Sequence, residues 1–202
     1  MQPSTPWTQL HLDYAQFEDT QILIIVDSYS KWIEAIPTAS TTSAARIDIL
    51  REVFAQFGLP TTIVTDNGPQ FQSAEFLSFA MNNGIQLKFT APYHPNSNGQ
   101  AERYVRMMKE ALKSNPNSWS VLNNVSGSTL LQKLSRFLLA YRRAPHTTTG
   151  VSPAELLLVR RLRSRLDLLQ TSNLRQREIP SPPSSCPSFH VGNRVNVQFY
   201  GK

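Results

Sequence analysis

An uninterrupted run of five apolar residues, Ile22 to Val26, constrains the fold more than any other feature of the sequence. Such a run is typical of a strand that is buried on both faces of a sheet. Residues 8–15 before it alternate between apolar and polar side chains, and residues 31–38 follow it after a short polar turn. The region 8–38 therefore predicts three successive strands arranged as a meander.

The spacing of apolar residues changes after this region. From Ser43 to Phe57 they recur at helical intervals, and Gly58 followed by Pro60 is a helix stop signal. Ser73 is a candidate N-cap for a second helix. The remaining elements are expected to be a strand, a helix, a strand and a late helix, over residues 61–66, 73–84, 86–91 and 129–144. With the helix described next, this order predicts an α/β fold: a mixed five-stranded sheet with flanking helices.

Residues 90–113, TAPYHPNSNGQAERYVRMMKEALK, combine two patterns. The first half is rich in turn-forming residues and predicts a loop. The second half predicts a helix with Glu102 in its first turn. At about 100° per residue, Arg106, Lys109 and Lys113 lie within about 40° of Glu102, and apolar residues fill the opposite arc. One helix face is therefore expected to pack on the sheet, and the other to present a carboxylate and three cations.

Charge is distributed unevenly along the chain. Residues 1–102 carry 4 Lys and Arg against 10 Asp and Glu, whereas residues 103–202 carry 16 against 4. This distribution favours a cation site beside a surface for polyanions, although a solvated basic tail remains the alternative. Cys186 is the single cysteine, which excludes an intrachain disulfide and a cysteine-rich zinc site. No stretch approaches the roughly 20 apolar residues of a membrane span, so we expect an intracellular protein without membrane contact.

Three carboxylates lie on three different predicted elements. Asp13 is inside the first strand, Asp66 ends the fourth, and Glu102 lies on the third helix, with 35 residues between it and Asp66. An acidic residue inside a strand is disfavoured unless something uses it. If the three converge at one sheet edge, they supply the oxygen ligands of hard divalent cations, and such a metal pair supports in-line phosphoryl displacement. Taken singly, each could equally be a solvated or salt-bridged acid.

The motifs around these carboxylates resemble the catalytic core of retroviral and long-terminal-repeat retrotransposon integrases, most closely the Gypsy-type group. The similar segments cover residues 7 to about 160 and read VDSYSKWIEA, FGLP, TDNGPQF, YHPNSNGQAER and YRRAPHTTTGVSPAELL, together with the strand that carries Asp13. The resemblance implies an RNase H-like fold and a catalytic D,D-35-E triad of Asp13, Asp66 and Glu102. It also implies two Mg²⁺ ions, for which Mn²⁺ would substitute: Asp13 would bridge both, and each of the other two carboxylates would serve one.

The function implied is that of a polynucleotidyl transferase of retrotransposon origin, which nicks DNA ends and transfers them to target DNA. The resemblance carries DNA contacts onto Arg106 and Lys109, and Lys113 shares their face. Polar residues of the preceding loop are further DNA-binding candidates: Tyr93, His94, Asn98 and Gln100. Asn67, Gly68 and Gly99 are expected to support the active site. DNA ends, target DNA and further copies of the chain in a homo-oligomer are the expected partners, and the nucleus is the expected location.

Two other interpretations remain open. The chain could be a domesticated or degenerate integrase-derived DNA-binding protein without full integration activity, or a nuclease acting on RNA–DNA hybrids. The complete set of carboxylates argues against the first, and YHPNSNGQAER argues against the second. We expect a catalytic core over residues 1–160, a basic, Pro/Ser-rich linker over 161–188, and the truncated start of a C-terminal small β-barrel over 189–202. The zinc-binding module that precedes the core in this family is expected to be missing.

Overall fold

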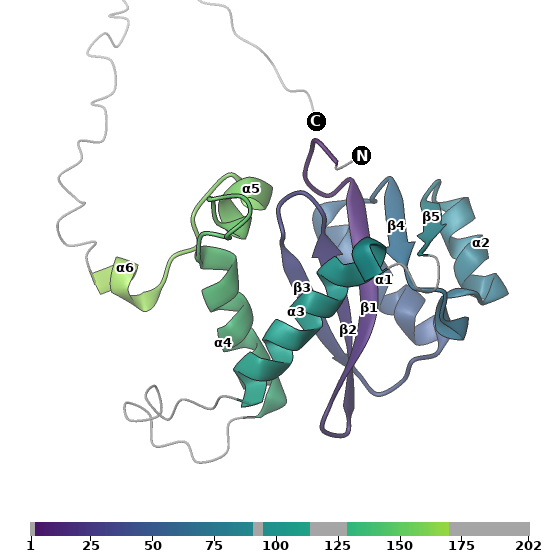
Figure 1. The fold of residues 1–202 in the computed structure, drawn as a ribbon, viewed down its shortest axis with the longest axis horizontal. Helices are drawn as coiled ribbons and strands as arrows, with labels where there is room; N and C mark the ends of the chain where they lie inside the picture. The colour runs from purple at the N-terminus through teal and green to yellow at the C-terminus, as the bar shows by residue number, and fades with distance from the viewer. Residues whose placement is uncertain (1–2, 91–94, 114–128, 170–202) are drawn as a thin grey trace, which may run out of the picture. The chain divides into compact units, whose positions relative to one another are not determined.

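Five strands of the described residues form one mixed sheet (Figure 1). The computed structural model describes residues 3–90, 95–113 and 129–169, and for residues 95–102 it describes the backbone only. The strand order is β3-β2-β1-β4-β5, antiparallel from β3 to β1 and parallel from β1 to β5. The strand bounds are β1 (Gln9–Phe17), β2 (Thr20–Asp27), β3 (Ile33–Thr38), β4 (Thr62–Thr65) and β5 (Gln86–Phe89). The predicted meander and mixed five-stranded sheet are confirmed.

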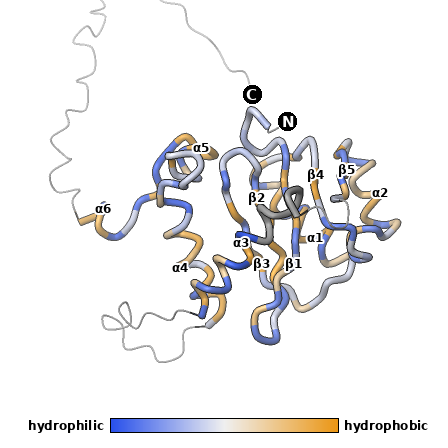
Figure 2. The backbone as a smooth tube through the Cα atoms, in the orientation of Figure 1, coloured by the Kyte–Doolittle hydropathy of each residue, from blue (hydrophilic) through white to orange (hydrophobic). Residues whose placement is uncertain are grey.

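The apolar run in β2 is continuous because both faces of this strand are covered. Leu23 and Ile25 belong to one buried cluster, whereas Ile22, Ile24 and Val26 belong to another. Successive side chains of a strand point to opposite faces, so a strand between two cores needs apolar residues at every position. In Figure 2 the turn between β1 and β2 is hydrophilic.

Among the described elements, two long helices lie on each face of the sheet. The first pair is α1 (Ser43–Phe57) and α2 (Ala74–Asn82), which share one core with Leu23 and Ile25. The side chains of Thr42 and Ser73 cap their N-termini by accepting hydrogen bonds from backbone N–H groups in the first turn. The second pair, α3 (Pro95–Lys113) and α4 (Leu130–Arg143), shares the other core with Ile22, Ile24 and Val26.

The third helix begins earlier than the sequence predicts. We expected a loop up to residue 100 and Glu102 in the first helical turn, but α3 starts at Pro95. Proline suits the first position of a helix because its φ angle is preset and its missing N–H group would have no helical partner. The weak helix formers between residues 96 and 99 then continue a helix that is stabilised further along by packing.

Three short elements complete the described part of the chain. A 3₁₀ turn, η1 (Pro69–Phe71), follows Asp66 closely, and the side chain of Ser152 caps the N-terminus of α5 (Pro153–Leu158). The third, α6 (Arg165–Leu169), lies within the region predicted as linker. The chain divides into one compact unit, Met1–Leu162, and a second, Arg163–Lys202. The segments predicted as the rest of the linker and as the β-barrel start lie outside the described residues, so the domain boundaries stay a prediction.

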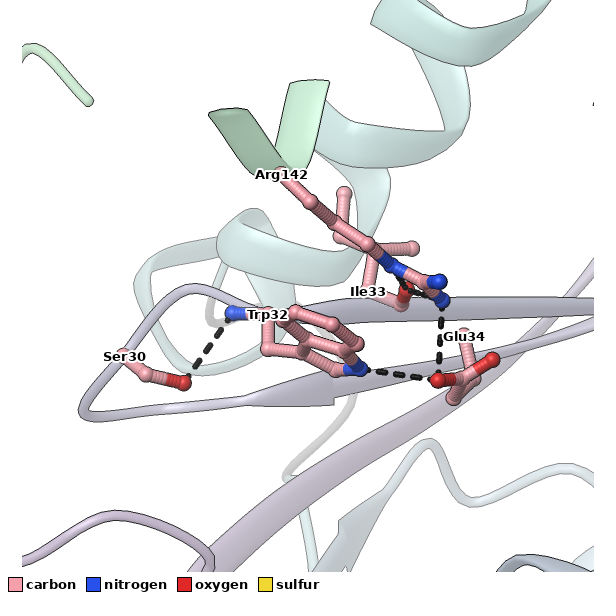
Figure 3. A network of polar contacts seen from close by, with 5 residues as sticks. All are labelled: Ser30, Trp32, Ile33, Glu34 and Arg142. Carbon is pink, nitrogen blue, oxygen red and sulfur yellow. Dashed lines mark hydrogen bonds and ion pairs between the residues drawn. The ribbon is translucent and has the colours of Figure 1, made fainter. Parts of the chain in front are cut away.

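The C-terminal end of α4 is fixed to the edge strand β3 by a polar network (Figure 3). Arg142 donates from Nη2 to the carbonyl of Ile33 at 2.6 Å and pairs with Glu34 Oε1 at 2.8 Å. Its guanidinium lies 4.1 Å from the centroid of the Trp32 ring, and Trp32 Nε1 donates to the same Glu34 oxygen. Burial lowers the pKa of Arg142, and the Glu34 carboxylate partly offsets this effect. The VDSYSKWIEA motif therefore serves, in part, to anchor α4.

Among the helices of the described segments, none combines the length and the apolar character that a membrane crossing requires.

Candidate active site

The parallel pairing of β1 with β4 brings Asp13 and Asp66 to the same end of the sheet. His11 on β1 pairs with Val64 on β4, and the two strands run parallel. Asp13 and Asp66 each lie two residues beyond this pair in the same direction. Because side chains alternate along a strand, Asp13 projects to the face that carries α3, and Asp66 directly follows the last residue of β4. The convergence of Asp13, Asp66 and Glu102 at one sheet edge stays a prediction, and the register brings the first two to the same end of the sheet.

Backbone N–H groups hold one oxygen of each carboxylate. The N–H of Tyr14 donates to Asp13 Oδ1 at 2.7 Å, and the N–H of Gly68 donates to Asp66 Oδ1 at 3.2 Å. Both aspartates are partly buried. These bonds restrict the rotation of each carboxylate, so the two groups are partly oriented before any ligand binds.

The turn after Asp66 is held by its own side chains. Gln72 donates from Nε2 to the carbonyl of Asn67 at 3.0 Å and to its side-chain oxygen at 2.7 Å. The carbonyl of Gly68 accepts from the N–H of Phe71 at 2.9 Å, and a Cβ atom at Gly68 would collide with the side chain of Gln70. Asn67 and Gly68 were predicted as supporting residues. Gln72 was not, because one glutamine after a turn carries no signal in sequence.

A cavity of about 390 Å³ lies between β1 and α3. Its lining residues are Asp13, Val105, Arg106, Lys109, Glu110 and Lys113. On the opposite side of α3, Tyr104, Met108 and Leu112 are buried in the core. The structure therefore brings all three predicted cations of this helix to the same space as the first aspartate, whereas Asp66 does not line this cavity.

Glu110 is a lining residue that the sequence analysis missed. It follows Lys109 directly and lies at the edge of the basic helix face, about 80° from Glu102 at 100° per residue. We restricted that face to residues within about 40° of Glu102, so a wider arc would have included Glu110. Its carboxylate places a negative charge among three positive ones.

Several predicted site residues lie outside the described residues, in whole or in part. Tyr93 and His94 are not described, and the side chains of Asn98, Gly99, Gln100 and Glu102 are not described either. The backbone of Glu102 lies in α3, one turn before Arg106. Among the side chains that the structure describes, no group of three potential metal ligands occurs. Asp13 on β1 and Asp66 directly after β4 nevertheless offer two carboxylates, a kind of donor that fits Mg²⁺ or Mn²⁺.

His146 connects α3 to the loop that follows α4. Its Nε2 lies 3.2 Å from Tyr104 Oη, and its Nδ1 accepts the N–H of Thr148 at 3.2 Å. Since Nδ1 is an acceptor, Nε2 carries the proton of the neutral ring and donates to Tyr104. Burial lowers the pKa of His146, and the positive charges of Lys31 and Arg103 lower it further. The helix that bears the basic face is thus tied to a neutral histidine.

Several known proteins are similar to this chain in sequence. Residues 4–95 match the model of the family described as "Integrase core domain". An uncharacterized protein of Caenorhabditis elegans is 35% identical over 173 residues, covering 85% of this chain and 13% of that protein. The Pol polyprotein of Feline endogenous virus ECE1 is 36% identical over 155 residues, covering 75% of this chain and 14% of that protein. The chain thus spans about one seventh of the length of these relatives.

Solved structures show the same fold. A chain of the simian T-cell lymphotropic virus intasome, in complex with PP2A regulatory subunit B56 gamma, superposes with a TM-score of 0.68 at 24% identity, covering 81% of this chain and 59% of that one. The HTLV-2 integrase catalytic core domain in complex with magnesium superposes with a TM-score of 0.61 at 19% identity, covering 76% and 98%. The predicted RNase H-like fold is confirmed.

Proposed function

This chain carries an integrase core domain, and on that premise we propose that it is the catalytic core of a polynucleotidyl transferase that nicks DNA ends and transfers them to target DNA. One observation carries the proposal. Asp13 lines the same cavity as Arg106, Lys109 and Lys113, so a cation-binding carboxylate and three phosphate-binding side chains meet at one place. Metal-dependent phosphoryl transfer requires both kinds of group beside the scissile phosphate.

In this proposal Asp13, Asp66 and Glu102 hold two Mg²⁺ ions, with Mn²⁺ as a substitute. When bound, the ions would activate the attacking oxygen and stabilise the leaving oxygen of an in-line displacement. The backbone N–H groups of Tyr14 and Gly68 each hold one carboxylate oxygen, and these hydrogen bonds keep the first two carboxylates oriented. The family's D,D-35-E spacing supports Glu102 as the third member, since its backbone lies one turn before Arg106 on α3.

The basic residues of α3 would bind the DNA backbone. Arg106 and Lys113 are exposed and Lys109 is partly buried, so their charged ends can reach phosphates on either side of the reacting one. We also assign DNA contacts to Tyr93, His94, Asn98 and Gln100, and a supporting role to Gly99, from their place in the motif. Their uncharged groups can donate and accept hydrogen bonds without adding to the charge of the site.

The assembly and location follow from the same proposal. The HTLV-2 core with magnesium is known in dimeric and trimeric forms, and the simian virus protein forms an intasome. We propose a homo-oligomer that holds two DNA ends, acting in the nucleus where target DNA is found. The relatives are polyproteins or much longer chains, so the activity of the whole protein is part of the proposal.

A disintegration reaction on a branched DNA substrate with Mn²⁺ tests the proposed chemistry. The wild-type chain should resolve the branch, and Asp66→Asn should reduce the rate by several orders of magnitude while DNA binding persists. A wild-type chain that binds the branched DNA but never resolves it would favour the alternative, an integrase-derived DNA-binding protein. Equal rates with and without a divalent cation would contradict the assignment of the carboxylates.

A further inference from the structure

Arg46 on α1 is fully buried although it carries a formal positive charge. Its guanidinium carbon lies 4.7 Å from the ring centroid of Phe71, 5.1 Å from that of Phe76 and 5.7 Å from that of Tyr14. Nε donates to Tyr14 Oη at 3.3 Å, and Nη2 donates to the carbonyl of Thr41 at 3.1 Å. Nη1 is also buried and has no hydrogen-bond partner among the described residues.

This burial is unfavourable by itself. Within the described segments, no carboxylate forms an ion pair with Arg46. A buried charge without a counter-ion is costly, and stacking on aromatic rings offsets only part of that cost. An apolar side chain of similar length would fill the same space without the penalty. The presence of an arginine at this position is therefore best explained by the groups that its guanidinium connects.

Those groups are direct neighbours of the two aspartates. Tyr14 follows Asp13 in β1 and holds its carboxylate through the backbone N–H. Phe71 ends the turn that starts at Asp66, and its N–H donates to the carbonyl of Gly68, whose own N–H holds the Asp66 carboxylate. The rings of Tyr14 and Phe71 stack at 5.8 Å. Arg46 thus contacts both carboxylate-bearing segments from the opposite face of the sheet.

The sheet itself does not make this connection. The parallel ladder between β1 and β4 ends at the pair His11 and Val64, before either aspartate is reached. From the α1 face, one planar guanidinium spans the gap between the two segments, because it can stack on several rings while it hydrogen-bonds to a hydroxyl.

We propose that Arg46 is a positioning residue that fixes the separation and orientation of Asp13 and Asp66. This inference rests on the proposed function only in taking these two aspartates as the cation-binding pair. Arg46 acts through Tyr14 and Phe71 and touches neither substrate nor cation. Its loss loosens the turn after Asp66 more than it loosens the rest of the core.

The test compares Arg46→Met with two controls on the same helix. Methionine keeps an unbranched side chain but removes the positive charge and the planar guanidinium group with its N–H donors. Val53→Ala removes apolar contacts from the same core, and Arg51→Met makes the same chemical change at an exposed position. Amide hydrogen exchange, measured by NMR on the metal-free proteins, should be at least tenfold faster at Gly68 and Phe71 in Arg46→Met than in Val53→Ala, after correction for global stability. Arg51→Met should match the wild type.

Mn²⁺ binding, followed by the electron paramagnetic resonance of the free ion, provides the second measurement. Affinity should fall at least fivefold in Arg46→Met and stay within twofold of wild type in both controls. Arg46→Lys, which keeps the charge but not the planar guanidinium group, should show an intermediate loss.

Equal exchange at Gly68 in Arg46→Met and Val53→Ala would overturn the inference. So would two Arg46 variants that fail to fold while Val53→Ala folds, since Arg46 would then serve stability alone. A wild-type chain that binds no Mn²⁺ would instead remove the metal site from the proposed function, and the exchange data would still decide the role of Arg46.

Discussion

Asp13 on β1 and Lys109 on α3 line one cavity. A carboxylate that suits cations and an ammonium group that suits anions therefore face the same space. The carboxylate is fixed by the N–H of Tyr14, whereas Lys109 extends from the basic face of α3. This arrangement allows the two groups to be tested separately, because a change in one leaves the other in place.

Asp13→Asn should abolish specific Mn²⁺ binding while the chain stays folded. Asparagine has the same shape but lacks the negative charge that a divalent cation requires. Calorimetric titration with Mn²⁺ measures the effect. Asp48→Asn, an exposed change on α1 at the other face of the sheet, is the matched control and should bind as the wild type does. Equal binding by Asp13→Asn and wild type would remove Asp13 from the site.

Lys109→Glu should weaken DNA binding by about 1–3 kcal/mol and make it less sensitive to salt, because one phosphate contact becomes a repulsion. Titrations of a labelled duplex at several salt concentrations provide both quantities. Arg51→Glu makes the same change of charge on the opposite face of the sheet and should have a much smaller effect. If both variants bind equally well, the basic face of α3 is merely solvated.

Glu110→Gln should have the opposite effect and strengthen DNA binding. The wild-type carboxylate lines the cavity beside Lys109 and Lys113 and repels phosphate, so its neutralisation should gain about 0.3–1 kcal/mol, the range of exposed charge pairs. The same duplex titration measures this gain, which should shrink as salt increases. Weaker binding by Glu110→Gln would indicate that Glu110 orients the lysines instead.

Arg142→Met should destabilise the protein by about 2–4 kcal/mol, because it leaves the Glu34 carboxylate partly buried without its cation. Chemical denaturation gives the free energy of unfolding. Combining Arg142→Met with Glu34→Gln should restore part of the loss, since the second change removes the unpaired charge. Strictly additive losses would mean that the ion pair contributes nothing and that stacking on Trp32 holds α4.

Stability should fall as pH drops from 7 to 5, in part because of His146. Its pKa is lowered in the folded protein, so below about pH 6.5 the unfolded chain binds more protons and folding becomes less favourable. The groups that face it are Tyr104, Lys31 and Arg103. Free energies of unfolding at pH 7, 6 and 5 should show a shallower fall for His146→Gln than for wild type. An unchanged slope would show that His146 titrates normally.

Local sequence patterns predicted those elements whose ends are marked by neighbouring residues. The helix α1 runs from Ser43 to Phe57 as expected, because apolar residues at helical spacing meet a glycine stop at Gly58, where φ is +89°. The strand β2 was equally clear, since only a strand between two cores is apolar at every position.

Other features depend on contacts that no local pattern encodes. The start of α3 at Pro95 was missed because weak helix formers look like a loop until packing further along the helix is counted. The role of Arg46 depends on partners from other elements, and that of Gln72 on the shape of the turn after Asp66, so neither residue gave a usable signal in sequence. Within the site, the pairing of Asp13 with the basic face could be predicted because three cations and Glu102 repeat at helical spacing. The effect of Glu110 could not be predicted without the cavity.

The anchoring of α4 on β3 has a consequence for synthesis on the ribosome. Tyr141 donates to the carbonyl of Lys31, and Arg142 binds Ile33 and Glu34. The helix α4 therefore packs on a part of the chain that is synthesised some 110 residues earlier. Until α3 and α4 have left the exit tunnel, the face of the meander that carries Ile22, Ile24 and Val26 has no cover. A growing chain that pauses before residue 130 therefore presents an apolar sheet to its surroundings, and we expect it to need a chaperone. Contacts so distant in sequence also make folding slow.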